Sequence, residues 1–130
     1  MAEDWHRAAI VGDTEEMARQ LADGKGVDAL DGYGQTALML AARHGHDASV
    51  VLLVDHGAAL DVTAKYGLSA LMLAVVNRHD GIARRLVAAG ANLALQGTGA
   101  PGFSGKTARV LAEDSGQVEL AAEIAAAGGP

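Results

Sequence analysis

Residues 34–42 read Gly-Gln-Thr-Ala-Leu-Met-Leu-Ala-Ala, and residues 67–75 read Gly-Leu-Ser-Ala-Leu-Met-Leu-Ala-Val. Seven of these nine positions are identical or exchange Thr for Ser, and the two stretches lie 33 positions apart. The same spacing relates the Gly-Ala pair at 57–58 to the one at 90–91. A fixed period of about 20 to 50 residues is typical of repeat proteins. The sequence therefore predicts an array of similar units.

Two further units follow from the same register. Counting back 33 positions from Ala-Ala at 41–42 leads to Ala-Ala at 8–9, and Gly-Lys-Thr-Ala at 105–108 repeats the start of the motif. This last copy begins 38 positions after Gly67, so five residues are inserted, and we place them within 96–104. The units are expected at about 1–30, 31–63, 64–95 and 96–130, in a single domain that spans 1–130.

Each unit is predicted to contain two short helices. Thr36 is a good N-cap for the first helix, and Gly45 supplies the left-handed residue that ends it. The second helix is expected to begin near Asp47 and to end at Gly57, and the turn at 31–34 forms a tip between units. The predicted fold is therefore all-α, a solenoid of helix-turn-helix units with short β-turn tips between them.

Two departures from the repeat predict local features. Arg78 stands where other units have Gly12, Gly45 and Gly116. If this position requires positive φ, Arg78→Gly should stabilise the fold by about 0.5 to 1 kcal/mol. The first and last units carry charged residues where apolar ones recur, as at Arg109, so we expect them to be the capping units of a complete array.

Composition excludes several classes of protein. The 130 residues are 50% hydrophobic and 3% aromatic, include no cysteine and have a formal net charge of −6. A disulfide scaffold and a thiolate metal site are therefore excluded, and the scattered bases form no stripe for nucleic acid phosphates. The acidic N-terminal residues do not fit a secretory signal, and the longest apolar run, 70–76, is too short to span a bilayer. We expect a cytoplasmic protein with neither nucleic acid nor membrane as a partner, and the alanine and glycine content suggests a bacterial source.

The segment Asp-Gly-Tyr-Gly-Gln-Thr-Ala-Leu at 31–38, Gly-His at 45–46, Gly-Ala at 57–58 and the period of 33 resemble the ankyrin repeat. The resemblance covers about residues 4–128 and implies four tandem repeats. It also implies an interaction module, an adaptor, inhibitor or scaffold, that binds another protein on the concave face formed by turn tips and inner helices. The family's usual Thr-Pro-Leu-His is Thr-Ala-Leu-Met at 36–39 here, so we expect the methionines to pack between units.

The positions of this sequence that correspond to that concave face are the candidate binding residues. Both tyrosines and the only phenylalanine fall at turn tips, where we expect exposed rings to contact a partner, although each ring could instead pack on the neighbouring tip. The inserted stretch 96–104 is expected to be the least constrained segment and to become ordered on binding. The candidate residues are Tyr33, Gln35, Arg43, His44, Lys65, Tyr66, Leu68, Val76, Asn77, Phe103 and Lys106.

Other interpretations compete with this one. Residues 100–107, Ala-Pro-Gly-Phe-Ser-Gly-Lys-Thr, fit a relaxed phosphate-loop pattern, so nucleotide or anion binding is the alternative function. Against it, Gly-Lys-Thr at 105–107 falls on the repeat motif, and no parallel strand is predicted before it. The serines form no nucleophile elbow and the histidine spacing matches no zinc motif, so we expect neither an enzyme nor a metal or other cofactor. Self-association through the alanine-rich segment 118–127 stays open, although we expect a monomer.

Overall fold

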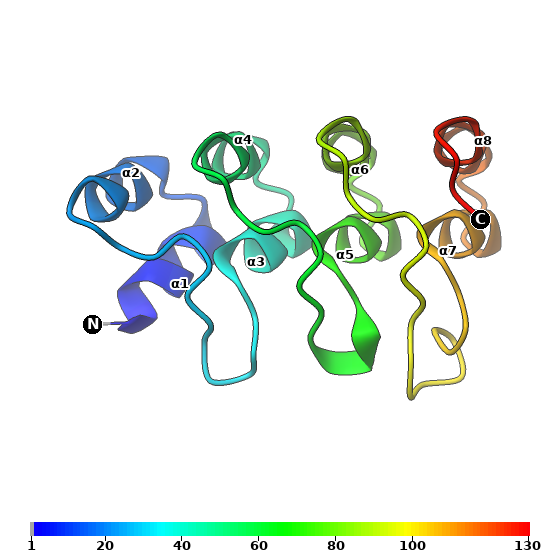
Figure 1. The fold of residues 1–130 in the computed structure, drawn as a ribbon, viewed down its shortest axis with the longest axis horizontal. Helices are drawn as coiled ribbons and strands as arrows, with labels where there is room; N and C mark the ends of the chain where they lie inside the picture. The colour runs from blue at the N-terminus through cyan, green and yellow to red at the C-terminus, as the bar shows by residue number, and fades with distance from the viewer. Residues whose placement is uncertain (1) are drawn as a thin grey trace.

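A computed structural model describes residues 2–130 of the chain, with side chains from Asp4 onwards, as four pairs of helices. The first helices of the pairs, called the inner helices, lie side by side in one row, and the second, outer helices form another row (Figure 1). No helix in this part of the chain is long and apolar enough to cross a membrane. The pairs are α1 (Ala2–Val11) with α2 (Thr14–Ala22), α3 (Ala37–His44) with α4 (Asp47–Asp55), α5 (Ala70–Val76) with α6 (Asp80–Ala88), and α7 (Ala108–Asp114) with α8 (Val118–Ala126).

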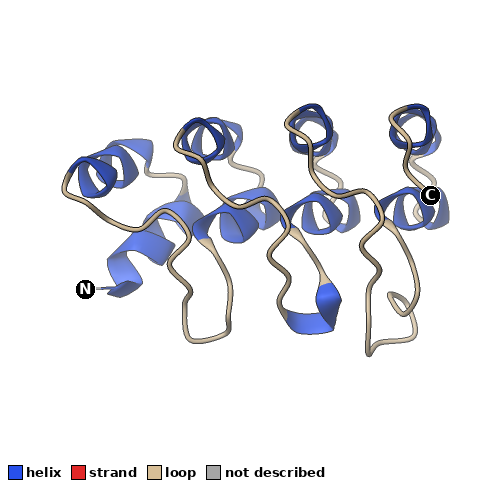
Figure 2. Cartoon of the chain, in the orientation of Figure 1, coloured by secondary structure: helices blue, strands red, loops and turns tan. Residues whose placement is uncertain are grey.

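The connections between pairs project to one side of the inner helices (Figure 2). We call them tip 1 (31–35), tip 2 (64–68) and the inserted loop (96–106). Tip 2 contains a short 3₁₀ helix, η1 (Lys65–Gly67), and the described residues hold no β-strand beyond an isolated bridge between Gly97 and Ser104. The prediction of an all-α helical solenoid is confirmed.

The inner helices begin and end as the motif predicts. The hydroxyl oxygens of Thr36, Ser69 and Thr107 accept hydrogen bonds from the third residue after each of them, at 3.2, 3.3 and 3.4 Å. Gly45 ends α3 with φ of 79°, and α4 then begins at Asp47. Because a side-chain acceptor satisfies an otherwise unpaired amide at a helix start, the repeated Thr or Ser fixes where each helix begins.

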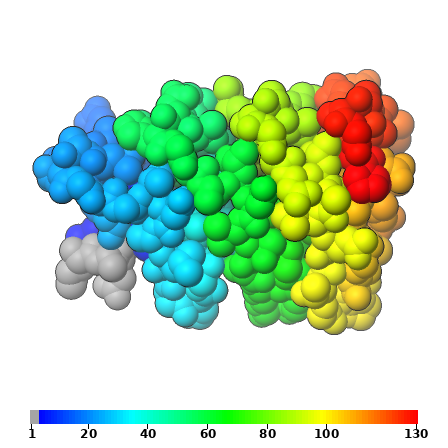
Figure 3. All heavy atoms as spheres, in the orientation of Figure 1, coloured from blue at the N-terminus to red at the C-terminus, as the bar shows by residue number. Residues whose placement is uncertain are grey.

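The core runs along the whole array, between neighbouring units. Every residue of α3 from Ala37 to Ala42 is buried, since α3 packs against α1 on one side and α5 on the other. Met39 and Met72 are 2% and 1% exposed and belong to this core, which agrees with the expected packing of methionines between units. Figure 3 shows the units as successive slabs in chain order. Stability therefore comes from the interfaces between neighbours.

Hydrogen bonds between units follow the same repeat. The Nε2 atom of His46 donates to the carbonyl oxygen of Ile10 at 2.7 Å, and that of His79 donates to the carbonyl oxygen of Arg43 at 3.0 Å. In the last unit Gln117 takes the place of histidine and donates to the carbonyl oxygen of Val75 at 2.9 Å. These bonds satisfy carbonyls that helix ends leave without a partner. His46 and His79 thus serve the contacts between units.

The inserted loop is closed by its own backbone. Gly97 donates to the carbonyl oxygen of Lys106 and Gly105 donates back to that of Gly97, both at 2.9 Å. The Thr98 amide donates to the Tyr66 carbonyl oxygen in tip 2 at 2.7 Å. These bonds tie the loop to itself and to the preceding unit, and the expectation that this segment is the least constrained part of the chain stays a prediction.

Candidate functional site

Tip 1 is a tight turn built on one carboxylate. An oxygen of Asp31 accepts hydrogen bonds from the amides of Tyr33 and Gln35, each at 2.9 Å, and the Gly34 amide bonds to the Asp31 carbonyl oxygen. Aspartate commonly accepts such bonds from amides in turns. The turn holds the Tyr33 ring outward, with 84% of the residue exposed.

Tip 2 presents its tyrosine differently. Tyr66 lies in η1 with φ of 63°, and the Nζ atom of Lys65 lies 5.0 Å from the centre of its ring. The Phe103 ring packs on Tyr66 with 5.5 Å between ring centres, so Phe103 is half-buried and Tyr66 is 38% exposed. The expectation of three exposed rings is therefore wrong for Phe103, because the inserted loop folds back onto tip 2.

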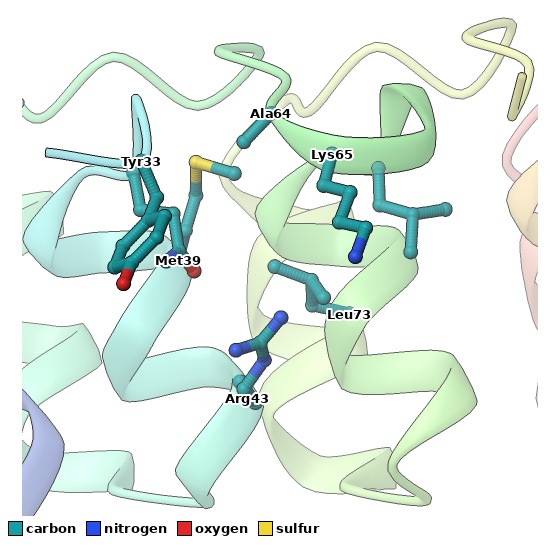
Figure 4. A pocket seen from close by; sticks show the side chains of 8 residues that line it. Tyr33, Met39, Arg43, Ala64, Lys65 and Leu73 are labelled. Carbon is teal, nitrogen blue, oxygen red and sulfur yellow. The ribbon is translucent and has the colours of Figure 1, made fainter. Parts of the chain in front are cut away.

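A pocket of about 370 Å³ lies between tips 1 and 2, above α3 and α5 (Figure 4). Five candidate residues line it, and Met39, Ala64 and Leu73 supply the rest of its lining. Arg43 from α3 and Lys65 from tip 2 point into the same space from opposite sides, with Leu73 between them. The structure thus brings together Tyr33, Gln35, Arg43, Lys65 and Leu68, the last of which is buried.

His44 lies beside this pocket at the end of α3. Its ring stacks on that of His46 with 6.4 Å between centres. Partial burial lowers the pKa of His44 below its usual value, and the positive charge of Arg43 lowers it further, followed by His46 and His79. Near neutral pH the ring is therefore predominantly uncharged.

The remaining candidate residues do not join the pocket. Val76 is half-buried at the end of α5, and the side chain of Asn77 donates to the Leu73 carbonyl oxygen at 2.8 Å. The Nζ atom of Lys106 lies 2.6 Å from a carboxylate oxygen of Asp114, so this lysine is already paired within the chain. The candidate role of Lys106 in partner binding stays a prediction, and a partner's acidic group would compete with Asp114 for this cation.

A second pocket, of about 860 Å³, opens on the other side of Tyr33. Its lining includes Ile10, Val11 and Leu30, which are 40%, 62% and 56% exposed. The candidate set lacked these residues. Ile10 and Val11 stand 33 positions before Arg43 and His44, so the repeat register itself was the signal that could have found them.

Comparison with known families decides the identity of the array. A family model for ankyrin repeats in three copies matches residues 5–97. The chain belongs to the ankyrin repeat family. Ankyrin repeats are generally protein–protein interaction modules, typically without enzymatic activity. The helix pair α7 and α8 lies beyond the matched residues and continues the rows of inner and outer ankyrin helices (Figure 1).

The phosphate-loop alternative gains no support from this ankyrin fold. A phosphate loop needs free backbone amides that converge on the anion. Here the amides of Phe103 and Ser104 donate to the Ala100 carbonyl oxygen, and the Lys106 amide donates to that of Phe103. The hydroxyl of Thr107 donates to the Pro130 carbonyl oxygen. Three backbone amides and the threonine hydroxyl of this loop are thus engaged within the chain.

Proposed function

We propose that this ankyrin repeat chain binds a partner protein on its tips and inner helices, as an adaptor, inhibitor or scaffold. The single observation that carries the proposal is the pocket between tips 1 and 2, where an exposed aromatic ring and two cations surround an apolar floor. Tyrosine and arginine are enriched among the residues that contribute most to protein interfaces. The proposed mechanism is rigid complementarity, since Asp31 and η1 fix the two tips before a partner arrives.

The proposal extends to the organisation of the chain. We propose that residues 1–130 form one domain of four repeats, at about 1–30, 31–63, 64–95 and 96–130, with the first and last as caps. The continuation of both helix rows through α7 and α8 supports the fourth repeat (Figure 1). We further propose that the protein acts as a monomer in the cytoplasm and without catalytic activity.

Affinity capture from the lysate of the source organism tests the proposed surface. The bait variant carries Tyr33→Ala, Arg43→Ala and Lys65→Ala, three exposed residues whose removal should leave the fold intact. The matched control carries Arg84→Ala and Arg85→Ala on the outer helix α6. We expect a protein to be retained by the wild type and the control and lost by the variant, as measured by mass spectrometry.

Equal retention by all three baits would contradict the proposed surface. Thermal unfolding followed by circular dichroism establishes that each bait is folded before capture. Capture lost only with the control variant would place the site on the outer helices instead.

A further inference from the structure

We propose that the partner contributes an extended peptide that carries a bulky apolar residue and, a few residues away, one or two acidic residues. The peptide lies across Tyr33, with its apolar side chain in the pocket formed by Ile10, Val11 and Leu30 and its carboxylate between Arg43 and Lys65. This inference rests on the proposed function, because it describes the ligand of that same surface.

The distribution of ion pairs favours an acidic ligand. Five of the ten lysine and arginine residues form ion pairs within the chain. Arg43 and Lys65 do not: no carboxylate of residues 4–130 lies within 4.0 Å of either cation. Two cations without a carboxylate partner in one pocket attract anionic groups, even in a chain with a net charge of −6. The paired cations are Arg19, Arg84 and Arg85 on outer helices and Lys106 and Arg109 in the last unit.

The pocket between the tips also strengthens the attraction. Met39, Leu68 and Leu73 form an apolar lining beneath the two cations. A carboxylate that enters is partly shielded from water, so its hydrogen bonds to Arg43 and Lys65 are stronger than at an open surface. A lone surface ion pair contributes little to affinity, whereas a carboxylate held by two cations over an apolar floor contributes more.

The second pocket favours an apolar side chain. Six large hydrophobic residues of the described chain are exposed, and four of them line this one pocket. Clustered exposed apolar residues mark interaction sites, whereas scattered ones are ordinary. The lining also includes the Asp31 carboxylate, which accepts bonds from the tip 1 amides, and the Arg7 guanidinium, so charges of both signs are present and the apolar cluster is what distinguishes this pocket. The four residues are Ile10, Val11, Leu30 and Tyr33.

Tyr33 connects the two pockets, because it lines both. An occupant that fills them together must pass over its ring, and an extended chain does so with successive side chains about 3.3 Å apart along its axis. The side chain of tyrosine loses little conformational entropy on binding, so it suits a continuous contact with a peptide backbone. One linear segment with an apolar and an acidic end therefore fits the surface better than two separate ligands.

Selection from a library of random linear peptides displayed on phage tests the proposal. The folded full-length chain is the target, and the consensus peptide is then synthesised and its Kd measured by fluorescence anisotropy. We expect a consensus with a large apolar residue and a nearby Asp or Glu. We expect the double variant Arg43→Gln and Lys65→Gln to weaken binding about tenfold or more, and the control Arg84→Gln and Arg85→Gln to leave it unchanged.

A double-mutant cycle separates a direct contact from general charge attraction. When the peptide's acid is replaced by its amide, Arg43→Gln and Lys65→Gln should cause almost no further loss. Leu30→Ser should raise the Kd of the peptide about tenfold. For a variant peptide with alanine at its apolar position, Leu30→Ser should leave the Kd unchanged. Independent effects in either cycle overturn the corresponding contact.

The remaining outcomes distinguish the two proposals. A consensus without acids that still needs Tyr33 overturns the acidic ligand but keeps the proposed surface. Peptides that bind Tyr33→Ala as well as they bind the wild type contradict the surface itself. A library that yields no binder overturns recognition of a linear peptide, whereas the capture experiment still tests the surface.

Discussion

The guanidinium of Arg78 donates a hydrogen bond to the Ser115 carbonyl oxygen, 2.9 Å away, from a residue whose own φ is 63°. The three equivalent glycines, Gly12, Gly45 and Gly116, have φ between 76° and 79°. The condition of positive φ, on which the Arg78→Gly prediction depends, is therefore met. Arg78 combines a strained backbone with a bond to the next unit, and substitution can separate the two effects.

We expect Arg78→Gly to raise the free energy of unfolding by about 0.5 to 1 kcal/mol, because relief of the left-handed strain exceeds the loss of an exposed hydrogen bond. Urea unfolding followed by circular dichroism measures this free energy. Arg78→Ala is the control, since it loses the bond and keeps the strain, so it should be less stable than the wild type. A glycine variant no more stable than the wild type would contradict the prediction.

Gly45→Ala and Gly116→Ala form a matched pair. Both residues have positive φ, so each alanine should cost about 1 kcal/mol in backbone strain. A Cβ at Gly45 would lie 2.7 Å from the His79 ring, whereas one at Gly116 meets nothing within 4 Å. We expect Gly45→Ala to cost about 1 kcal/mol more, because His79 must give up its bond to Arg43. Equal melting temperatures for the two variants would refute a specific role for His79.

The pKa of His44 gives a test by NMR titration. Burial and then the charge of Arg43 lower this pKa in the folded chain, so Arg43→Gln should raise it, whereas the control Arg84→Gln should not. The folded state favours the neutral ring, and this contribution to stability is full above about pH 6.5 and declines as the pH falls below it. When the pH is lowered from about 7.5 to about 5, we therefore expect the free energy of unfolding to fall less in the His44→Gln variant than in the wild type. A pKa at or above the usual histidine value would contradict the prediction.

The closed inserted loop predicts a contrast between two of its glycines. A Cβ at Gly97 would lie 2.3 Å from the Phe103 carbonyl oxygen, whereas one at Gly102 meets nothing within 4 Å. We expect Gly97→Ala to open the loop and to speed hydrogen exchange at the Thr98 and Gly105 amides about tenfold or more. Gly102→Ala should leave these rates unchanged. Slow exchange in both variants would show that the loop does not depend on this close approach.

The helices, their caps and the site of the insertion could be predicted because each depends on a local signal. Thr36 caps the helix that follows it, and Gly45 ends that helix, whatever lies elsewhere in the chain. The repeat then carries such signals from unit to unit. Local chemistry combined with a fixed period was sufficient for the fold.

The partners of side chains could not be predicted in the same way. Tyr66 is the repeat equivalent of Tyr33, but the insertion displaces Phe103 from the register, so nothing in the pattern pairs it with Tyr66. The pairing of Lys106 with Asp114, at opposite ends of α7, likewise depends on side-chain geometry within the last unit that the repeated motif does not contain. To predict a contact between units, one needs the distance between two side chains in space. The period of the repeat along the sequence does not give that distance.

Under the proposed binding mode, the inserted loop also limits how many ligands the array can hold at once. Thr98 and Phe103 lie against Tyr66, in the place that corresponds to the open space beside Tyr33. An array with a uniform period would present both tyrosines alike and offer two docking positions. The five extra residues keep one of them closed, so the proposed binding mode predicts one ligand per chain.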